Sequence, residues 1–318
     1  MDLPGVLVEA LSQLPAGIRQ AELQKEAQNL SLTYRSQEGM GSRLVTRDMQ
    51  AAAYAAARMP ATYGSIAKAL NYALAALPSH PHTLLDVGAG TGAAAWAAAG
   101  LLQLDEVTCL EREAAMRRLG QDLMQSGPPV LKSARWLERD LVADDIHERA
   151  GLVIAAYVLN EMTASGRAVT VKKLWQAAGQ LLLLVEPGTP AGYKHLIDAR
   201  EQLFALGAFV SAPCPHERPC PLDGADWCHF TCRVSRTRLH KQLKGGEAAY
   251  EDEKFSYMAF VREPCAPAHD RILRHPLVRK GHVMLSLCTR DGLQKRMVTK
   301  KDGEVYRFAR DASAGDAI

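Results

Sequence analysis

The sequence predicts a doubly wound α/β domain, and three observations support that prediction. Short apolar runs alternate with helix-patterned segments between residues 80 and about 205. The runs are almost continuously apolar, as expected of parallel strands that are covered on both faces. A glycine-rich stretch follows the first run, where such a domain turns from a strand into a helix. A helical region is expected before this domain, and a cysteine-rich, β-containing part after it.

Residues 1–78 are predicted to be helical because apolar side chains recur there at spacings of three and four. The clearest stretch is TRDMQAAAYAAARMPATYGSIAKALNYALAAL, which begins at Thr46. The N-terminus carries Asp2 and Glu9 without a basic cluster, so it does not predict a secretory signal. No apolar run reaches the roughly 18 residues that a bilayer span needs. We therefore expect a cytoplasmic protein that does not contact a membrane.

Residues 79–205 contain the predicted α/β domain. Its strands are expected in TLLDVG, EVTCLE, LVIAAYVL and QLLLLVEP, and its helices in GAAAWAAAGLLQ, REAAMRRLGQDLMQS and VTVKKLWQAAG. The first strand ends at Asp86, and Gly88, Gly90 and Gly92 follow it in LLDVGAGTG. Glycine permits positive φ angles and close approach of a ligand to the backbone. The next helix would present free N–H groups to that ligand.

An acidic residue, Glu111, ends the second predicted strand, 21 residues after Gly90. Acids at this distance suit hydrogen bonding to ribose hydroxyls. The spacing D-x-G-x-G-x-G resembles the S-adenosylmethionine loop of class I methyltransferases more than a dinucleotide loop. That resemblance implies Asp86 near the methionine moiety, glycines beneath the cofactor and Glu111 on the ribose. It also implies Asp140, in ERDL, against the adenine. A glycine turn without a ligand and an NAD-linked oxidoreductase are the alternatives.

The catalytic residues of a methyltransferase are expected after the fourth strand of the sheet, in the segment AAYVLNEM. Asn160 and Glu161 are the candidates there. The segment lacks the Asn/Asp-Pro-Pro-aromatic pattern of many amino-directed methyltransferases, and no cysteine lies between Cys109 and Cys214. Methyl transfer depends largely on positioning, so these departures do not exclude activity. A helix-capping pair is the alternative interpretation of Asn160 and Glu161.

Residues 206–318 are predicted to form a cysteine-rich metal loop followed by a basic β-meander. Strands are expected in KFSYMAFVRE, HVMLSLC, LQKRMVT and EVYRFAR, with turns at Asp291-Gly292 and Asp302-Gly303. Between Arg271 and Arg310 there are eleven Lys or Arg against three acids, an excess of eight positive charges. Such an excess favours an anionic partner, with an ordinary solvated face as the alternative. The last residues, DASAGDAI, are expected to fray.

Four of the seven cysteines lie within SAPCPHERPCPLDGADWCHFTCR. They are Cys214, Cys220, Cys228 and Cys232. Clustered cysteines in a reducing compartment bind metal more often than they form disulfides. The intervals C-x₅-C, C-x₇-C and C-x₃-C are irregular for a zinc knuckle, and prolines bracket them. The stretch therefore predicts a loop around an iron–sulfur cluster or zinc, with functionless buried thiols as the alternative.

Several motifs together resemble one known family. ATYGSIAKALN, LLDVGAGTGAAAWAA, LLVEPGTPAGYKHLIDAR, the APCPHERPCPL and DWCHF blocks and EKFSYMAFVRE occur in this order. They resemble the methyltransferase-like proteins associated with the small ribosomal subunit, known from mitochondria and bacteria. The resemblance runs from about residue 45 to the end. It implies a four-cysteine iron–sulfur (4Fe–4S) site whose ligands are Cys214, Cys220, Cys228 and, from SLCTRDG, Cys288. Local spacing would choose Cys232 as the fourth ligand, and Cys265 is a third choice.

The resemblance implies an S-adenosylmethionine-dependent methyltransferase that acts on small-subunit ribosomal RNA, or in small-subunit assembly or translation. The expected RNA contacts are Arg279, Lys280, Lys295, Arg296, Lys300 and Lys301. A catalytically inactive assembly factor, which keeps the fold and cluster as an RNA-binding scaffold, is the main alternative. A small-molecule methyltransferase with a zinc loop is another. We expect the protein to be a monomer away from the ribosome.

Overall fold

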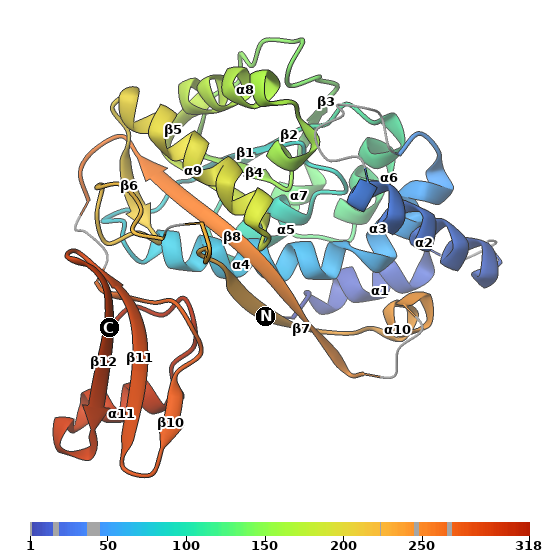
Figure 1. The fold of residues 1–318 in the computed structure, drawn as a ribbon. Coiled ribbons are helices and arrows are strands. Elements are labelled where there is room, and N and C mark those ends of the chain that lie inside the picture. The colour runs from blue at the N-terminus through green and yellow to red at the C-terminus, as the bar shows by residue number, and fades with distance from the viewer. Residues whose placement is uncertain (1, 15–18, 37–44, 223, 245–247, 266–268) are drawn as a thin grey trace.

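A large mixed sheet forms the body of the molecule. The computed structural model describes residues 2–14, 19–36, 45–222, 224–244, 248–265 and 269–318 (Figure 1). Within them the strands are ordered β3-β2-β1-β4-β5-β8-β6, and β7 pairs with β8. The parallel strands are β1 (Thr83–Val87), β2 (Glu106–Leu110), β3 (Arg135–Leu137), β4 (Ala150–Ala156) and β5 (Ala178–Pro187). The antiparallel part is β8 (Tyr250–Val261), β6 (Phe209–Ala212) and β7 (Phe230–Ser235).

This strand order is that of a Rossmann-like class I methyltransferase fold, so the predicted fold class is confirmed. The predicted apolar runs form β1, β2, β4 and β5, and each is buried on both faces. Successive residues point to opposite sides of the sheet. Leu84 packs with one hydrophobic cluster and Leu85 with the other. The short strand β3 was not predicted, because it is only three residues long and partly exposed.

Helices cover both faces of the large sheet. The cluster on one face includes side chains of α4 (Met59–Leu74) and α5 (Ala93–Leu101). The cluster on the other includes those of α8 (Ala164–Ala177) and α9 (Pro190–Ala205). The helices α6 (Ala114–Met124) and α7 (Pro129–Lys132) complete the layer beside α5 and β2. The body of the molecule is therefore a three-layer sandwich around one mixed sheet.

The N-terminal region is helical, as predicted. Its helices before α4 are α1 (Gly5–Gln13), α2 (Gln20–Ser36) and α3 (Asp48–Ala57). Leu23 and Leu30 of α2 share a buried cluster with Met116 of α6 and Leu243 of α10 (Arg238–Lys244). The alanines of α3 are buried in the same place, because their small side chains let the helices approach closely. None of the described helices is long and apolar enough to cross a membrane.

A second, smaller sheet stands beyond β6 at one end of the body (Figure 1). It comprises β9 (Arg271–Ile272), β10 (Leu277–Arg279), β11 (His282–Thr289) and β12 (Gly292–Thr299). The predicted hairpin at Asp291-Gly292 joins β11 to β12. The prediction of a strand in EVYRFAR was wrong, because this segment forms the helix α11 (Glu304–Asp311). The helix follows the turn η2 (Lys300–Asp302). Fully buried Ala309 packs α11 on Val283 and Val298, a contact that overrides the β-propensity of the segment.

The final segment is bound to the rest of the chain, so the predicted fraying was wrong. The N–H of Gly315 donates to the Ile272 carbonyl at 2.8 Å, and the N–H of Ile272 donates to the Asp316 carbonyl at 3.0 Å. The Tyr72 hydroxyl of α4 donates to the Asp316 carboxylate at 2.9 Å. These partners lie far away in the sequence, which is why composition alone could not reveal them.

Candidate functional site

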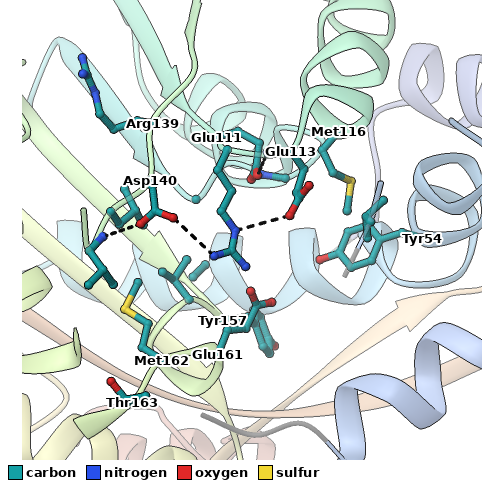
Figure 2. A pocket seen from close by; sticks show the side chains of 18 residues that line it. Tyr54, Glu111, Glu113, Met116, Arg139, Asp140, Tyr157, Glu161, Met162 and Thr163 are labelled. Carbon is teal, nitrogen blue, oxygen red and sulfur yellow. Dashed lines mark hydrogen bonds and ion pairs between the residues drawn. The ribbon is translucent and has the colours of Figure 1, made fainter. Parts of the chain in front are cut away.

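One cavity lies at the carboxyl ends of β1, β2 and β4 (Figure 2). Its volume is about 300 Å³, which suits a small-molecule ligand. The edge of a doubly wound sheet where its strand order reverses is the usual binding crevice of such folds. Its lining includes Gly88, Gly90, Glu111, Asp140, Tyr157 and Glu161. Tyr54 of α3 also lines it, so the helical N-terminal region contributes one wall.

Two glycines shape the loop between β1 and α5. Gly88 has a φ of +68°, and a Cβ added there would lie 2.4 Å from the Val158 side chain. Gly90 has a φ of +56°, and a Cβ there would meet nothing within 4 Å. Gly88 therefore allows the loop to pack against the segment after β4, whereas Gly90 leaves open space beside the backbone. Gly92 caps α5 and does not line the cavity.

Glu111 is fixed by backbone groups on both of its carboxylate oxygens. Oε2 accepts the Gly90 N–H at 2.8 Å, and Oε1 accepts the Glu113 N–H at 2.8 Å. The residue follows directly after β2 and is only 8% exposed. Burial raises the pKa of Glu111, and the two N–H groups oppose that rise. The carboxylate is thereby held in one orientation at the wall of the cavity.

Asp86 lies behind the glycine loop and does not line the cavity. Its carboxylate accepts the N–H of Ala95, in the first turn of α5, at 3.1 Å. Burial raises the pKa of Asp86 to about 7. The residue thus ties β1 to α5, in a position from which it supports the loop.

Asp140 lines the cavity, where it is joined by residues that the sequence reasoning did not identify. Arg112 lies between Glu113 and Asp140, with N···O distances of 3.5 Å and 3.8 Å (Figure 2). The other Asp140 oxygen accepts the N–H groups of Val142 and Ala143, which fixes the carboxylate. The available signal was the run of charges in Glu111-Arg112-Glu113, at the end of a buried strand.

Tyr157 is the first residue after β4, and sequence reasoning also missed it. Its φ is +62°, a conformation that costs about 1–3 kcal/mol for a residue other than glycine. The Tyr157 N–H donates to the Val185 carbonyl at 2.7 Å. The hydroxyl lies 3.0 Å from Ser65 Oγ and donates to Glu253 at 3.3 Å. Contacts from α4, β5 and β8 therefore hold this residue in place at the cavity wall.

The turn η1 (Leu159–Glu161) contains both predicted catalytic residues. The buried Glu186 carboxylate accepts the N–H groups of Leu159 and Asn160, at 2.9 Å and 3.1 Å. Glu161 lines the cavity, whereas Asn160 does not. Within the described part of the chain, the Glu161 carboxyl makes no hydrogen bond or ion pair, and burial raises its pKa to about 7. The charge of Arg112 opposes this rise in pKa, and a cationic ligand in the cavity would oppose it further.

Four cysteines line a second cavity. Cys214, Cys220 and Cys228 come from the loop between β6 and β7, and Cys288 comes from β11. Burial raises the pKa of each of Cys214, Cys228 and Cys288, in the last case to about 12. Cys232 lies apart, in β7 and buried in the core, and Cys265 lines a separate cavity. The structure therefore brings together the four cysteines of the family resemblance.

Two buried arginines stand beside the cysteine loop. The Arg200 guanidinium donates to the Arg218 carbonyl at 2.7 Å, and the Arg271 guanidinium donates to the Pro213 carbonyl at 3.0 Å. Both charges lower the pKa of Cys214, against the larger effect of its burial. A zinc ion or an iron–sulfur cluster that is bound by four thiolates carries a net negative charge. Buried arginines offset this charge. Among the described residues, no three His, Cys, Asp or Glu side chains are grouped closely enough for a single metal ion.

The predicted RNA contacts are all exposed on the smaller sheet and its turns. Arg279 ends β10, Lys280 follows it, and Lys300 and Lys301 lie in η2. Lys295 pairs with Ser286 and Arg296 with Leu285, so these two neighbours point to opposite faces. The basic side chains therefore surround the edge strand β12 and its ends instead of forming one flat patch.

Comparisons with known proteins identify relatives over most of the chain. The family profile described as "Mitochondrial small ribosomal subunit Rsm22" matches residues 48–318. The human protein "Ribosome assembly protein METTL17, mitochondrial" is 33% identical over 287 residues, covering 83% of this chain and 61% of the human protein. "Rsm22-cox11 tandem protein 2, mitochondrial" of Schizosaccharomyces pombe is 26% identical, covering 85% of this chain and 43% of that protein. The chain thus spans less than two thirds of either relative.

Two solved structures are similar to this chain at low sequence identity. The DhpI–SAH complex is 17% identical with a TM-score of 0.44, and the match covers 77% of this chain and 98% of DhpI. Magnesium protoporphyrin IX methyltransferase (ChlM) from Synechocystis, with bound SAM, is 14% identical with a TM-score of 0.44. That match covers 75% of this chain and 97% of ChlM.

The expected cytoplasmic location was wrong. The matching family profile is described as mitochondrial, and so are the human and fission-yeast relatives. The expectation depended on the composition of the first residues, which identifies a secretory signal but does not decide between other compartments.

Proposed function

The chain belongs to the Rsm22 family, and from that premise we propose that it binds S-adenosylmethionine and acts in assembly of the small ribosomal subunit. The cavity at the carboxyl ends of β1, β2 and β4 is the observation that carries the proposal. The human relative is named a ribosome assembly protein, as is a relative from Saccharomyces cerevisiae that is 25% identical over 175 residues. The latter match covers 34% of this chain and 28% of that protein.

The residues of the cavity fit this cofactor chemically. Glu111 offers a fixed carboxylate for the ribose hydroxyls, and Asp140 an acceptor for the adenine side. The open space beside Gly90 leaves room for the cofactor against the loop. Glu161 presents a buried carboxyl to the cavity, and S-adenosylmethionine carries both a sulfonium and an ammonium group. When bound, the cofactor supplies an electrophilic methyl group.

We propose small-subunit ribosomal RNA as the methyl acceptor. With its pKa near 7, the Glu161 carboxylate can accept a proton from an acceptor group at neutral pH. Tyr157, fixed from three sides, would define the wall against which a base is positioned. The test measures cofactor binding by calorimetry and transfer of a labelled methyl group to small-subunit particles. Absence of binding would refute the proposal, and transfer abolished by Glu161→Gln would support it.

A non-catalytic assembly factor is the second candidate, and a specific observation favours it. The Asn160 side chain, which is the candidate for orienting an amino acceptor, does not line the cavity. Its backbone N–H is instead bonded to Glu186, which fixes the turn. Cofactor binding without methyl transfer to any small-subunit particle would select this candidate.

We further propose that Cys214, Cys220, Cys228 and Cys288 hold a 4Fe–4S cluster, with zinc as the alternative. The convergence of three loop cysteines and a strand cysteine on one cavity supports this proposal. So do the adjacent guanidinium groups of Arg200 and Arg271. The four ligands would fasten β11 to the loop that precedes β7, which contributes to folding free energy. Anaerobic purification with iron, sulfide and zinc analysis tests the proposal.

The exposed basic side chains of the smaller sheet are proposed to contact ribosomal RNA. Phosphate contacts give affinity without reading the base sequence, and the basic residues surround one edge strand. Strong salt dependence of binding to small-subunit RNA is the expected signature. We propose that the protein is a monomer away from the ribosome, which sedimentation of the purified chain would test.

A further inference from the structure

Two tyrosine hydroxyls belong to the cysteine cavity. Tyr193 lies in the first turn of α9, and Tyr257 lies in β8. Both residues line the cavity with the four cysteines, and they are 8% and 2% exposed. Each comes from an element of the large sheet domain rather than from the cysteine loop itself. The cavity therefore has a rigid wall on that side.

The Tyr193 hydroxyl donates a hydrogen bond to Cys220 Sγ at 3.0 Å. Its position is fixed by the start of α9, where the Tyr193 N–H donates to the Thr189 carbonyl at 3.0 Å. Thr189 Oγ1 also accepts the Gly192 N–H at 3.1 Å. The hydroxyl is thus presented to the sulfur by a capped helix end and not by a mobile side chain.

The Tyr257 hydroxyl is buried and has no hydrogen-bond partner among the described residues. A buried hydroxyl without a partner is unfavourable, and such groups in native proteins usually have one. The cavity that Tyr257 lines is also lined by Arg271, Cys214 and Cys228. Arg271 can only donate, so it cannot accept the hydroxyl hydrogen. Deprotonated sulfur in the cavity would provide the missing acceptor.

We propose that Tyr193 and Tyr257 donate hydrogen bonds to sulfur in the occupied cysteine site and raise its reduction potential. This inference rests on the proposed iron–sulfur cluster. Reduction adds negative charge, and hydrogen bonds to sulfur stabilise the more negative state. The two tyrosines would be tuning residues, supplied by the methyltransferase-like domain to the metal site.

The test compares Tyr193→Phe, Tyr257→Phe and the double variant with the wild type after anaerobic purification. Each substitution removes one hydroxyl and keeps the ring. Tyr63→Phe is the matched control, because Tyr63 is a buried tyrosine of α4 that does not line the cysteine cavity. Iron and sulfide are measured first, then the midpoint potential by spectroelectrochemistry. We expect full iron content, a more negative potential in each single variant, a larger shift in the double variant, and no shift in the control.

Different failures are distinguishable. Unchanged potentials at full iron content would overturn the role of the tyrosines and leave the cluster standing. Zinc alone, or no metal, in the wild type would overturn the cluster and this inference together. If a variant loses its cluster, resonance Raman spectra of the wild type in H₂O and D₂O decide. Iron–sulfur stretching bands that shift in D₂O support donation to sulfur, and bands that do not shift overturn it.

Discussion

The two candidate sites of this molecule are built in different ways. The cofactor cavity is formed by residues at the ends of neighbouring parallel strands, and backbone N–H groups already hold its key carboxylate, Glu111. The cysteine cavity is formed by a loop and by Cys288, which comes from a separate sheet. The first site is organised by the sheet without its ligand. The second brings together segments from two different sheets.

Burial acts on both sites, with different consequences. It raises the pKa of Glu161 to about 7, so that carboxyl ionises near neutral pH without a ligand. It raises the pKa of Cys288 to about 12, so that thiol stays protonated until a metal displaces the proton. A carboxylate site can therefore be ready before binding, whereas a thiolate site is completed by its metal. We therefore expect that only the second site couples ligand binding strongly to folding.

The largest expected effect concerns the fourth cysteine. Cys288→Ser should abolish iron and sulfide content almost completely, because the loop then loses its only ligand from the smaller sheet. The matched controls are Cys232→Ser and Cys265→Ser, which alter the two competing cysteines. Iron and sulfide analysis of the three purified variants provides the measurement. Retention of the cluster in Cys288→Ser, with loss in either control, would reassign the ligand.

In the cofactor cavity, Glu111→Ala should weaken S-adenosylmethionine binding roughly 10–100-fold, as expected for the loss of charge-assisted hydrogen bonds. The substitution also releases the N–H groups of Gly90 and Glu113. Glu106→Ala is the control, since Glu106 is exposed at the start of the same strand. Titration calorimetry measures both. Equal affinities for the two variants would show that the cofactor does not use this wall.

Sequence alone could predict what depends on local patterns. The strand-end position of Glu111 and the glycines after β1 follow from an apolar run and a loop, and the structure has both. It could not predict Tyr157, whose positive φ depends on contacts with Val185, Ser65 and Glu253 from three other elements. Nor could local spacing show that Cys288, and not Cys232, lines the cavity with the other three cysteines, because this depends on how a distant strand docks.

The C-terminal part shows the same limit. The Asp291-Gly292 hairpin was predictable because turn residues act locally. The helix α11 was not predictable, because packing of its apolar residues on the smaller sheet determines its conformation. The composition of the final segment predicted fraying, but hydrogen bonds with Tyr72 and Ile272 fix it in place. Local rules therefore predicted strands and turns, and failed where a distant partner decides.

The pH dependence of cofactor binding tests whether the ionised Glu161 carboxylate contacts the cofactor. The raised pKa of Glu161 means that the carboxyl is neutral below about pH 7 and charged above it. A cationic ligand prefers the charged form, so affinity should rise about three- to ten-fold between pH 6 and 8. Glu161→Gln should flatten this dependence. Calorimetry at several pH values provides the measurement, and a profile unchanged in the variant would assign the titration to another group.

The basic residues around β12 should contribute in small, similar steps. Replacing Lys295, Lys300 or Lys301 with alanine should weaken binding to small-subunit RNA a few-fold each at low salt. Each lost phosphate contact should reduce the slope of log affinity against log salt by about 0.7–0.9. Lys132→Ala, in α7, is a control on the body of the molecule. Filter binding at several salt concentrations measures the slopes, and equal slopes for all variants would remove this surface from RNA binding.

The smallest expected effect is the most direct test of the comparison. Two of the hydrogen bonds that join the cysteine loop to the large sheet reach the strands β5 and β8: Trp227 Nε1 donates to the Gly188 carbonyl at 3.0 Å, and Ser256 Oγ donates to the Cys228 carbonyl at 2.7 Å. Both bonds end on β8 or directly after β5, and these strands are paired along their length in the core. The strands should therefore keep their geometry when the loop loses its metal.

Chelation of the metal should accordingly change S-adenosylmethionine affinity by less than about two-fold, because sites joined only through a rigid element behave almost independently. Over the same treatment, limited proteolysis should become faster within the loop between β6 and β7 and in the smaller sheet.

The two measurements on one sample distinguish independent sites from coupled sites. Faster cleavage with unchanged affinity supports two independent sites. A loss of affinity beyond about ten-fold would mean that Glu186 and the turn it holds, η1, respond to the cysteine loop through β5. The metal would then control the cofactor cavity.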